Sequence, residues 1–456
     1  MKITFIADTH YYSKSLGVSG RAYELRSGSD QKCLGETQEI IDSAFEKIAQ
    51  SDAVAVVILG DLSNDGERVS HEEFRQKLYA LQESKDVYII TATHDWCCDE
   101  NPRSFVGDEV FGDVEVMKSD ELYDFYKDFG LKRAIDSFVT KIGTLCYTVE
   151  LCKGVRLLLL NDDKNENDHA GYTEDCWQWI EKQIENARND NCLLIGAQHH
   201  LLFPHFSALI EGGSTCVENR EYVASRFADA GLKYMFVGHS HIQSTTKFTS
   251  PNGNEITQVN VASLVGYPAP IVNIEVNGDN TLTYNVEHLE HFYIGSRKID
   301  AQRYLAKHAS DVIFRILECK SKKDFEQRLT ALGLDGKRLS HTWFLARHIL
   351  SKLNTCFVWD VYKMLKRLGL AKNISKSDAL EYRYKPLKEL IGEICLSVLD
   401  GALVPHERES SYYRVVYGAL SVLPTVFKNN DDMKELLNTV DIILTGGEIN
   451  NQHATI

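Results

Sequence analysis

Five short segments rich in aspartate and histidine each follow directly on an apolar run of the sequence. The apolar runs occupy residues 3–7, 54–59, 87–91, 192–197 and 234–237. Runs of this length, bounded by polar turns, are typical of buried parallel strands. Ligands of open α/β sheets bind beyond the carboxyl ends of such strands. The sequence therefore predicts that five strands deliver carboxylate and imidazole groups to one site.

The five segments together have the composition of a metal centre. They read Asp8-Thr9-His10, Gly60-Asp61, Thr93-His94-Asp95, His199-His200 and Gly238-His239-Ser240-His241. An isolated Asp-x-His is usually incidental, and Gly-Asp after a strand is often only a turn. Gly-His-x-His is more specific, because glycine permits a close backbone approach and the two imidazoles can reach one metal pair. The occurrence of all five in order, each at a strand end, predicts a single metal site.

The same segments resemble the motifs of the calcineurin-like metallophosphoesterases over about residues 1–290. The family pattern runs Asp-x-His, Gly-Asp-x-x-x-Asp-Gly, Gly-Asn-His-Asp/Glu, a histidine segment and Gly-His-x-His. The second motif is complete here from Gly60 to Gly66, and the fifth is complete from Gly238 to His241. The resemblance implies an α/β fold in which a two-sheet β-sandwich is flanked by helices.

The resemblance also implies a site for two divalent metal ions, with Asp61 as the ligand that bridges them. The other ligands would be Asp8, His10 and His241 for the first metal and Thr93, His199 and His239 for the second. Mixed imidazole and carboxylate ligation suits Mn, Fe, Zn, Ni or Co and does not choose among them. His94 corresponds to the family's non-ligand histidine, which contacts the phosphate and assists the leaving group. Asp95, the next residue, could orient that imidazole.

Two departures from the family pattern leave alternatives open. Ala92 and Thr93 replace the Gly and Asn of the third motif. A Thr hydroxyl is a poorer donor than an amide oxygen, so Thr93 ligates weakly, a water takes its place, the second metal binds loosely, or Thr93 only continues the strand. Leu201 stands where the histidine segment commonly has Pro. That alignment favours His199 as the ligand and leaves His200 as the alternative.

Secondary-structure patterns divide the chain in two. Helical stripes at 36–50, 72–84 and 174–186 alternate with the motif strands, and later strand patterns lie at 256–261, 271–276 and 281–286. After about Ser296 the patterns are helical, and 456 residues suffice for two cores. We expect a metallophosphoesterase catalytic domain at residues 1–295 and an all-helical C-terminal domain at residues 296–456. The second domain could cap the cleft, dimerise or only buttress the sandwich, and buttressing is the simplest role.

Two long polar segments follow the first and third motifs. Loops of such length in compact domains are usually functional or mobile. The first, residues 11–36, begins at a ligand, and it either folds over the cleft with Tyr11, Tyr12 and Arg21 near the substrate or remains a surface loop. The second, residues 97–128, could wall the opposite side, where Arg103 offers a guanidinium to a phosphate.

The composition of the chain disfavours some classes of binding partner. A net charge of −15 disfavours nucleic acid polymers, which bind clustered Lys and Arg. No run reaches the roughly 18 uncharged apolar residues of a membrane span. Met1 leads straight into the first strand, so we expect no signal peptide and a cytoplasmic location. The partner expected is a small phosphate-ester substrate, and the oligomeric state is open.

These features predict metal-dependent hydrolysis of phosphate esters by a metal-bridging hydroxide. Two metals about 3.5–4 Å apart generate such a nucleophile and clamp the substrate. By resemblance to bacterial members with a helical C-terminal domain, we expect a phosphodiesterase that acts on a small or cyclic nucleotide. A phosphomonoesterase or a protein phosphatase is the alternative within this enzyme class. Outside it, the alternative is a catalytically weak binding or regulatory protein with a degraded second metal site.

Overall fold

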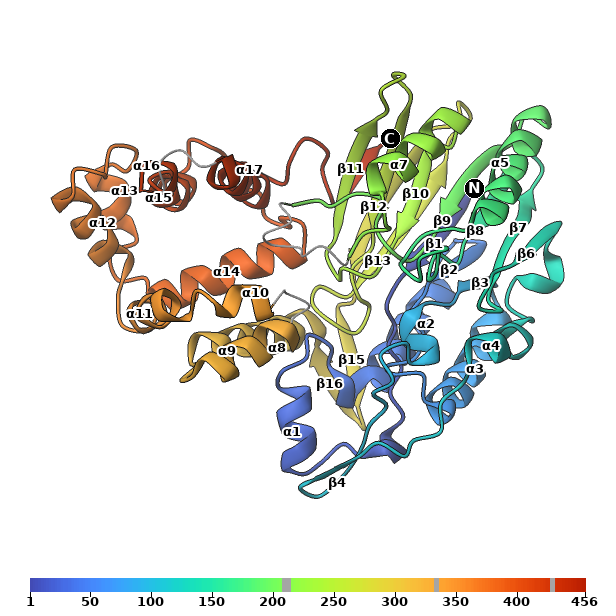
Figure 1. The fold of residues 1–456 in the computed structure, drawn as a ribbon, viewed down its shortest axis with the longest axis horizontal. Coiled ribbons are helices and arrows are strands. Elements are labelled where there is room, and N and C mark those ends of the chain that lie inside the picture. The colour runs from blue at the N-terminus through green and yellow to red at the C-terminus, as the bar shows by residue number, and fades with distance from the viewer. Residues whose placement is uncertain (207–214, 332–335, 427–430) are drawn as a thin grey trace.

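The computed structural model describes residues 1–206, 215–331, 336–426 and 431–456. Two sheets pack face to face in one part of the molecule, and a group of helices extends to the side of them (Figure 1). Both ends of the chain lie on the side of the sheets. The expected α/β sandwich flanked by helices, followed by C-terminal helices, is confirmed.

The first sheet contains the strands that lead to the first three motifs. Its strand order is β17-β14-β13-β1-β2-β3. In that order the strands span His453–Thr455, Leu282–His288, Pro270–Val276, Lys2–Ile6, Ala55–Leu59 and Asp86–Ile90. The strands β1, β2 and β3 run parallel, whereas β13 and β14 are antiparallel to their neighbours. All five residues of β2 are buried, because both faces of this sheet are covered, and this explains its continuous apolar sequence.

The second sheet contains the strands that lead to the last two motifs. Its strand order is β11-β12-β10-β9-β8-β7-β6. In that order the strands span Ser244–Thr249, Glu255–Asn260, Tyr234–Val237, Leu193–Ala197, Val155–Leu159, Leu145–Cys152 and Asp136–Val139. Between the two sheets, the rings of Phe5 and Phe236 stack with their centroids 3.9 Å apart.

Helices with one apolar face cover the outer surfaces of both sheets. The helices α2 (Thr37–Gln50) and α3 (Arg68–Gln82) pack on the first sheet, and α5 (Glu174–Asn189) and α7 (Arg220–Ala230) pack on the second. In α2 the buried side chains recur at the three- and four-residue spacing of one helix face, namely at Ile40, Ile41, Ala44, Phe45 and Ile48. Helices thus cover both outer faces of the sandwich. The carboxyl ends of its strands are not covered by these helices, and a ligand can bind there.

Short elements occupy the two long polar segments. The first segment contains α1 (Arg21–Ser27). The second contains the hairpin of β4 (Ser104–Val106) and β5 (Glu109–Phe111), followed by α4 (Ser119–Tyr126). A further hairpin, β15 (His291–Ile294) and β16 (Arg297–Asp300), connects the sandwich to the C-terminal helices.

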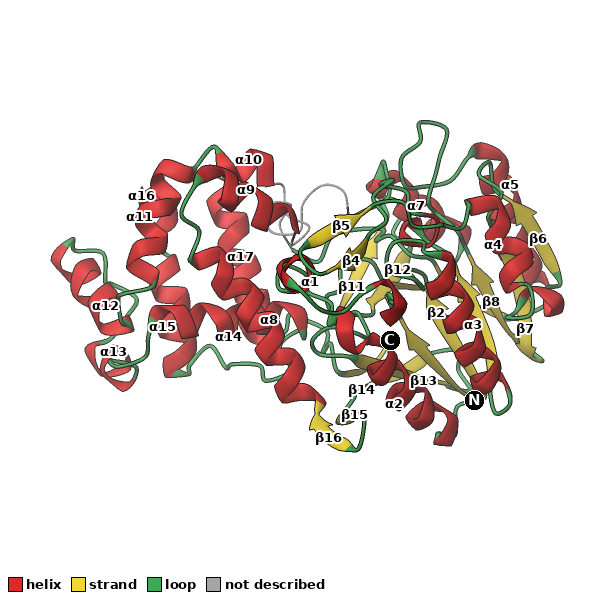
Figure 2. Ribbon diagram, turned by 90° about the horizontal axis from the view of Figure 1, so that it is seen from below, coloured by secondary structure: helices red, strands yellow, loops and turns green. Residues whose placement is uncertain are grey.

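The C-terminal helices form the lateral group in Figures 1 and 2. From α8 to α17 they span Ala301–Leu317, Lys322–Ala331, Gly336–Ser340, Trp343–Leu353, Val358–Arg367, Lys376–Glu381, Leu387–Leu399, Ser411–Leu420, Leu423–Val426 and Asp431–Thr445. The chain then returns to the sandwich, where β17 pairs with β14 at the edge of the first sheet. The last residues therefore differ from the expected all-helical segment, and a strand of three residues is too short to show a period in the sequence. In the described part of the chain, none of the helices combines the length and the apolar character needed to cross a bilayer.

Candidate metal centre

The five motif segments lie at the carboxyl ends of five strands, three from the first sheet and two from the second. Asp8 and His10 follow β1, Asp61 follows β2, and the 3-10 turn Thr93–Trp96 follows β3. The backbone N–H of His10 donates to the carbonyl of Asp61 at 2.9 Å, so the first two motifs are joined through their main chains. The histidine segment follows β9 and Gly-His-x-His follows β10, and both meet the first sheet at this edge.

The side chains form two groups of three around the centre of the site. The candidate ligand atoms of Asp8, His10 and His241 all lie within 4.8 Å of one another, and the same holds for Asp61, His199 and His239. Nε2 of His10 lies 3.1 Å from Nε2 of His241, and Nδ1 of His239 lies 3.2 Å from Nε2 of His199. The carboxylate of Asp61 connects the two groups, because one of its oxygens, Oδ2, is 3.1 Å from His199 Nε2 and 3.8 Å from His10 Nε2.

The backbone at this site is strained in a way that most residues avoid. The five candidate ligands with a positive φ are Asp8 (51°), His10 (36°), Asp61 (49°), His239 (69°) and His241 (56°). Left-handed φ values are uncommon for residues other than glycine, and they occur preferentially where a site over-determines the geometry. The turns after β1, β2 and β10 thus direct side chains toward the centre of the site. The left-handed backbone conformation costs free energy, which the packing of the rest of the fold offsets.

Two glycines leave the room that these side chains occupy. A Cβ atom on Gly60, whose φ is +86°, would lie 2.7 Å from Nδ1 of His199. A Cβ atom on Gly238 would lie 2.7 Å from Oδ2 of Asp8. Both distances are shorter than Cβ contacts in real proteins, so the motif glycines are required for the approach of the candidate ligands.

Burial and neighbouring charges shift the pKa values of several of these groups. Burial, assisted by the charge of Lys32, holds the pKa of His10 well below its usual value. Burial and the neighbouring His200 do the same for the pKa of His239. Burial alone would raise the pKa of Asp61, but His199 and His94 hold it well below its usual value. Neutral His10 and His239 beside the ionised Asp61 are donors that divalent transition metals bind, whereas Asp61 raises the pKa of His199 well above its usual value despite burial.

His94 lies beside this centre and faces a cavity. One of its ring nitrogens lies within 4.8 Å of the candidate ligand atoms of His10 and Asp61, and its side chain is 34 % exposed. Its Nδ1 is 2.5 Å from the carbonyl oxygen of Asn64, so Nε2 is the nitrogen left for a ligand. Burial opposes protonation of His94, but the charge of Asp61 and the hydrogen bond with Asp65 raise its pKa to about 9.

Asp95 does not orient His94, contrary to the expectation from the sequence. One carboxylate oxygen of Asp95 accepts from the backbone N–H of Ser63 at 2.9 Å, and the other accepts from the backbone N–H of Ala92 at 2.9 Å. The carboxylate that lies next to the imidazole is that of Asp65, 3.5 Å from Nδ1 of His94. Asp95 therefore fixes the turn that carries His94, because its own side chain points back into the loop. The sequence could have indicated Asp65 for this place, because Asp65 is the second aspartate of the Gly-Asp-x-x-x-Asp-Gly motif.

Thr93 occupies the expected place in the chain, at the first residue of the turn after β3. Its side chain is half-buried, and among the described residues it forms no hydrogen bond with a candidate ligand. Its carbonyl oxygen accepts from the backbone N–H of Cys98 at 3.0 Å. Within residues 1–206, 215–331, 336–426 and 431–456, no hydrogen bond occupies the Thr93 hydroxyl.

The geometry separates His199 from His200. His199 faces Asp61, whereas His200 belongs to a neighbouring group with Asp162 and Asp163. Asp162 accepts from the backbone N–H groups of both histidines, at 3.3 Å for His199 and 2.9 Å for His200. It thereby holds the turn in which the two imidazoles diverge. The ring of His200 still packs against His239, with centroids 4.4 Å apart, so it supports that imidazole from behind.

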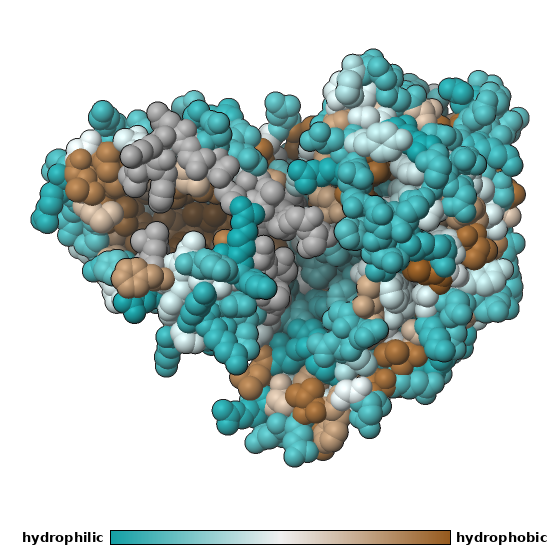
Figure 3. Space-filling view, in the orientation of Figure 1, coloured by the Kyte–Doolittle hydropathy of each residue, from teal (hydrophilic) through white to brown (hydrophobic). Residues whose placement is uncertain are grey.

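The site opens into a cavity of about 1030 Å³ that sequence reasoning described only in part. Figure 3 shows that the surface is hollowed at the boundary between the sandwich and the C-terminal helices. Besides the motif residues, the cavity is lined by the cationic side chains of Arg26, Lys32 and Arg103. Arg103 was anticipated, and its Nη2 lies 3.3 Å from Oδ2 of Asp65.

The first long segment does reach the cavity, but through other residues than those expected. The hydroxyl of Tyr11 donates to Glu73, and that of Tyr12 donates to the carbonyl of Gly17, so both tyrosines are packed away from the cavity. The backbone N–H of Arg21 donates to Oδ1 of Asp108, in the turn between β4 and β5 of the second segment. Arg26 and Lys32 face the cavity instead. No pattern in the sequence marks them, because the path of a loop depends on the tertiary contacts that hold it.

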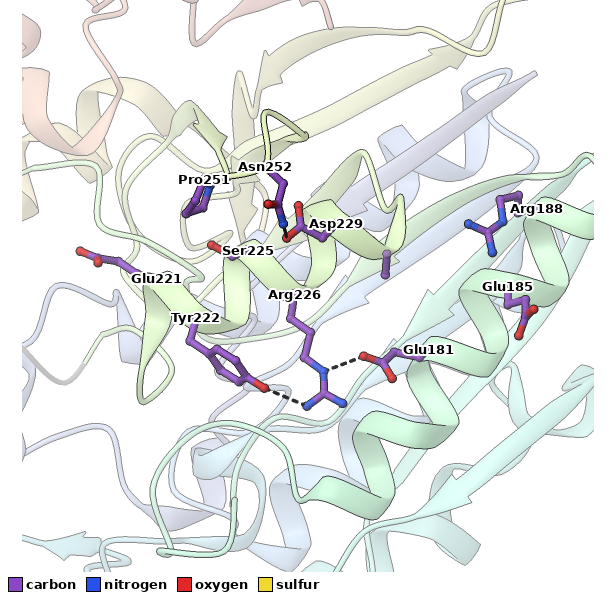
Figure 4. A pocket seen from close by; sticks show the side chains of 11 residues that line it. Glu181, Glu185, Arg188, Glu221, Tyr222, Ser225, Arg226, Asp229, Pro251 and Asn252 are labelled. Carbon is purple, nitrogen blue, oxygen red and sulfur yellow. Dashed lines mark hydrogen bonds and ion pairs between the residues drawn. The ribbon is translucent and has the colours of Figure 1, made fainter.

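A second cavity, of about 990 Å³, lies between α5 and α7 and carries no motif residue. Figure 4 shows Arg226 directed at Glu181 and Tyr222. Nε of Arg226 donates to Glu181 at 2.6 Å, and its Nη atoms donate to Glu174 at 3.0 Å. These charges satisfy one another on the surface, so the cavity is an ordinary groove between two helices.

One protein family and several solved structures are similar to this chain. The calcineurin-like phosphoesterase family model matches residues 1–243. No curated protein matches the chain. A dimetal phosphatase of Danio rerio is 13% identical, with 66% of this chain and 99% of that chain covered and a TM-score of 0.45. Yellow lupin purple acid phosphatase is 11% identical, with 66% and 52% covered and a TM-score of 0.40.

A putative 5'-nucleotidase of Staphylococcus aureus is also similar, with 11% identity, 68% of this chain and 58% of that chain covered, and a TM-score of 0.38. The family match covers more than half of the chain, and its range includes all five motif segments. The chain therefore belongs to the calcineurin-like phosphoesterase family and is a metal-dependent phosphoester hydrolase.

Proposed function

We propose that this hydrolase is a phosphodiesterase that acts on a small or cyclic nucleotide with two divalent metal ions. The observation that carries the proposal is the pair of three-residue groups that Asp61 connects. The ligands would be Asp8, His10, His241 and Asp61 for one ion and Asp61, His199, His239 and the hydroxyl of Thr93 for the other. A cavity of about 1030 Å³ leaves room for an organic group beside the phosphate, which supports a nucleotide-sized substrate.

The residues present fit two divalent ions. Nε2 of His10 faces Nε2 of His241 at 3.1 Å, a separation at which only one of the two nitrogens can carry a proton between them. The two buried carboxylates, Asp8 and Asp61, supply the negative charge that a cation needs. Asp61 raises the pKa of His199 well above its usual value despite burial, and metal binding can displace that proton. When bound, two such ions acidify the attacking water and neutralise charge on the phosphate oxygens.

His94 supplies the proton for the leaving group in this proposal. Its Nδ1 is held by the carbonyl of Asn64, which leaves Nε2 for the ester oxygen. The hydrogen bond with Asp65 favours the protonated form of this imidazole, which can donate a proton. Asp65 lies 3.5 Å from the same Nδ1, where it positions the ring and stabilises its charge. Lys32 and Arg103 add positive charge to the cavity and attract the anionic substrate.

Two other functions use the same residues. A phosphomonoesterase or a protein phosphatase needs the same two ions and the same proton donor, so the groups around Asp61 support it equally. The replacement of the family's Asn by Thr93 favours weaker binding of the second metal ion. In the extreme case, the protein would be a binding or regulatory protein with little turnover. Manganese and iron are the first metals to try, since imidazole and carboxylate ligands suit both.

The test is turnover of two matched nitrophenyl substrates. The protein is loaded with manganese, and hydrolysis of bis(p-nitrophenyl) phosphate is compared with that of p-nitrophenyl phosphate and of 3',5'-cyclic AMP. Preferred turnover of the diester and the cyclic nucleotide supports the proposal. Turnover of the monoester alone selects the phosphomonoesterase, and absence of turnover with a single bound metal selects the binding protein.

A further inference from the structure

We propose that α8 and α14 form a binding site for the organic group of the substrate, and that this group presents an aromatic or similarly apolar face. The inference rests on the proposed function, since it concerns the same cavity, and it assigns the C-terminal helices a role in substrate recognition. Buttressing of the sandwich would not require these helices to reach the site.

The cavity has two chemically different walls. One wall carries the candidate metal ligands together with Lys32 and Arg103. A second wall comes from the C-terminal helices. Its polar side chains are Glu326 and Gln327 of α9, and its apolar side chains are Ala309, Val312 and Ile313 of α8 and Cys395, Val398 and Leu399 of α14. A phosphate ester has the same division, because its phosphate is charged and its organic group is not. The two walls therefore match the two ends of one molecule.

Helical spacing places these side chains on one surface. Residues three and four apart share a helix face, and this spacing relates Ala309 to Val312 and Ile313 in α8 and Cys395 to Val398 and Leu399 in α14. One turn earlier in α8, Leu305 packs into the core beneath the first sheet. The stripe thus begins in the core and continues along the cavity, where Val398 and Leu399 pack beside Ile242 and Ile443 and also line the cavity.

Contacts at the end of α14 fix this wall relative to the candidate metal centre. The backbone N–H of Gln243, two residues after His241, donates to the carbonyl of Leu399 at 2.9 Å. The hydroxyl of Tyr267 donates to Oδ2 of Asp400 at 2.7 Å. Both anchors come from the segments that follow β10 and precede β13, so the apolar wall is tied directly to the loop that carries Gly-His-x-His.

The position of the apolar wall beside the candidate metal centre has a consequence for substrate specificity. A phosphate bound at the candidate metal centre directs its organic group away from the metals, and the part of the cavity that α8 and α14 line offers it an apolar surface. An apolar pocket discriminates between ligands by about tenfold or more for each group that it buries. We expect ligands with the same phosphonate group to bind more tightly as their organic group becomes larger and more apolar.

The experiment compares methylphosphonate, butylphosphonate and phenylphosphonate with the manganese-loaded full-length protein. Isothermal titration calorimetry gives Kd without any requirement for turnover. Phenylphosphonate is expected to bind at least about tenfold more tightly than methylphosphonate, with butylphosphonate between them. Equal affinities for the three compounds would overturn the inference, and this comparison needs no variant.

Substitutions then test which residues cause the preference for phenylphosphonate. The nearly isosteric changes Val312→Thr and Val398→Thr place a hydroxyl on the apolar wall and should reduce the preference for phenylphosphonate severalfold while the Kd of methylphosphonate stays the same. The matched control is Val404→Thr, at a valine that is 70% exposed and outside the cavity. An unchanged preference in both cavity variants would place the organic group elsewhere and contradict the inference.

The outcome also separates this inference from the proposed function. If inorganic phosphate and methylphosphonate fail to bind in the presence of manganese, the proposed metal centre is wrong. If both bind but phenylphosphonate has no advantage, the metal centre stands and the apolar subsite is wrong.

Discussion

Nε2 of His199 lies 3.1 Å from Oδ2 of Asp61, and the two residues come from different sheets. Asp61 follows β2 of the first sheet, and His199 follows β9 of the second. The contact joins the carboxyl edges of the two halves of the sandwich at a point that is closed to solvent. Asp61 is therefore the residue on which both groups of candidate ligands depend.

Replacement of Asp61 by Asn should remove metal and activity together. The amide keeps the shape of the side chain but loses the charge that compensates a cation, so phosphoesterase activity should fall by orders of magnitude. Metal content by plasma mass spectrometry should fall in parallel. The control is Asp52→Asn, at an exposed aspartate that pairs with Lys2. A fully metallated and active Asp61 variant would refute the bridging role.

Replacement of His94 by Ala should separate binding from chemistry. Both metals should stay bound, because His94 is not a proposed ligand, while kcat falls roughly 10²–10⁴-fold for substrates with poor leaving groups. The loss should be smaller with nitrophenolate, which leaves without a proton.

The variant His94→Gln serves as the comparison for this prediction. Its amide can still donate a hydrogen bond to the phosphate but cannot transfer a proton at neutral pH. If both variants lose the same activity for good and poor leaving groups, His94 only positions the phosphate.

Restoring the family's residue with Thr93→Asn should tighten the second metal. An amide oxygen reaches further than a hydroxyl and is a better donor, and the Thr93 hydroxyl has no competing partner among the candidate ligands of the described chain. Activity should saturate at a lower manganese concentration than in the unchanged protein. Equal or weaker manganese dependence would mean that the pocket is fitted to Thr93.

Lys32 should contribute to substrate binding rather than to metal binding. Its ammonium group is buried at the cavity, 3.8 Å from Oδ2 of Asp30. The change Lys32→Met removes one positive charge from the path of an anionic substrate, so KM should rise severalfold while metal content stays constant. The control is Lys85→Met, at another buried lysine, which bonds to the carbonyl of Ser51 far from the cavity. An unchanged KM would show that Asp30 already neutralises Lys32.

The five motif strands, and the motif that follows each of them, were predictable because the strand sequences are continuous and apolar. Each motif strand is buried on both faces, so the run from Val54 to Leu59 already indicates β2 and the position of Asp61 after it. The family resemblance added the layered fold. The three-residue strand β17 was not predictable, because it forms only where the chain returns to an existing sheet edge.

The surroundings of the site were less predictable than its centre. Asp95 was expected beside His94 because it is the next residue, but a turn directs neighbouring side chains in different directions, and Asp65 takes that place. Tyr11 was expected at the substrate, yet its hydroxyl finds a partner in Glu73. The apolar wall of α8 and α14 could not be predicted, since it depends on how the helices dock against the sandwich.

The most direct test of the account is the number of metal ions that activity requires. The protein is stripped with a chelator and titrated with manganese, while bound metal and bis(p-nitrophenyl) phosphate hydrolysis are measured on the same samples. Two ions per chain at full activity are predicted, with the second bound more weakly because of Thr93. Full activity at one ion per chain, or hydrolysis that persists without metal, would contradict the proposed centre.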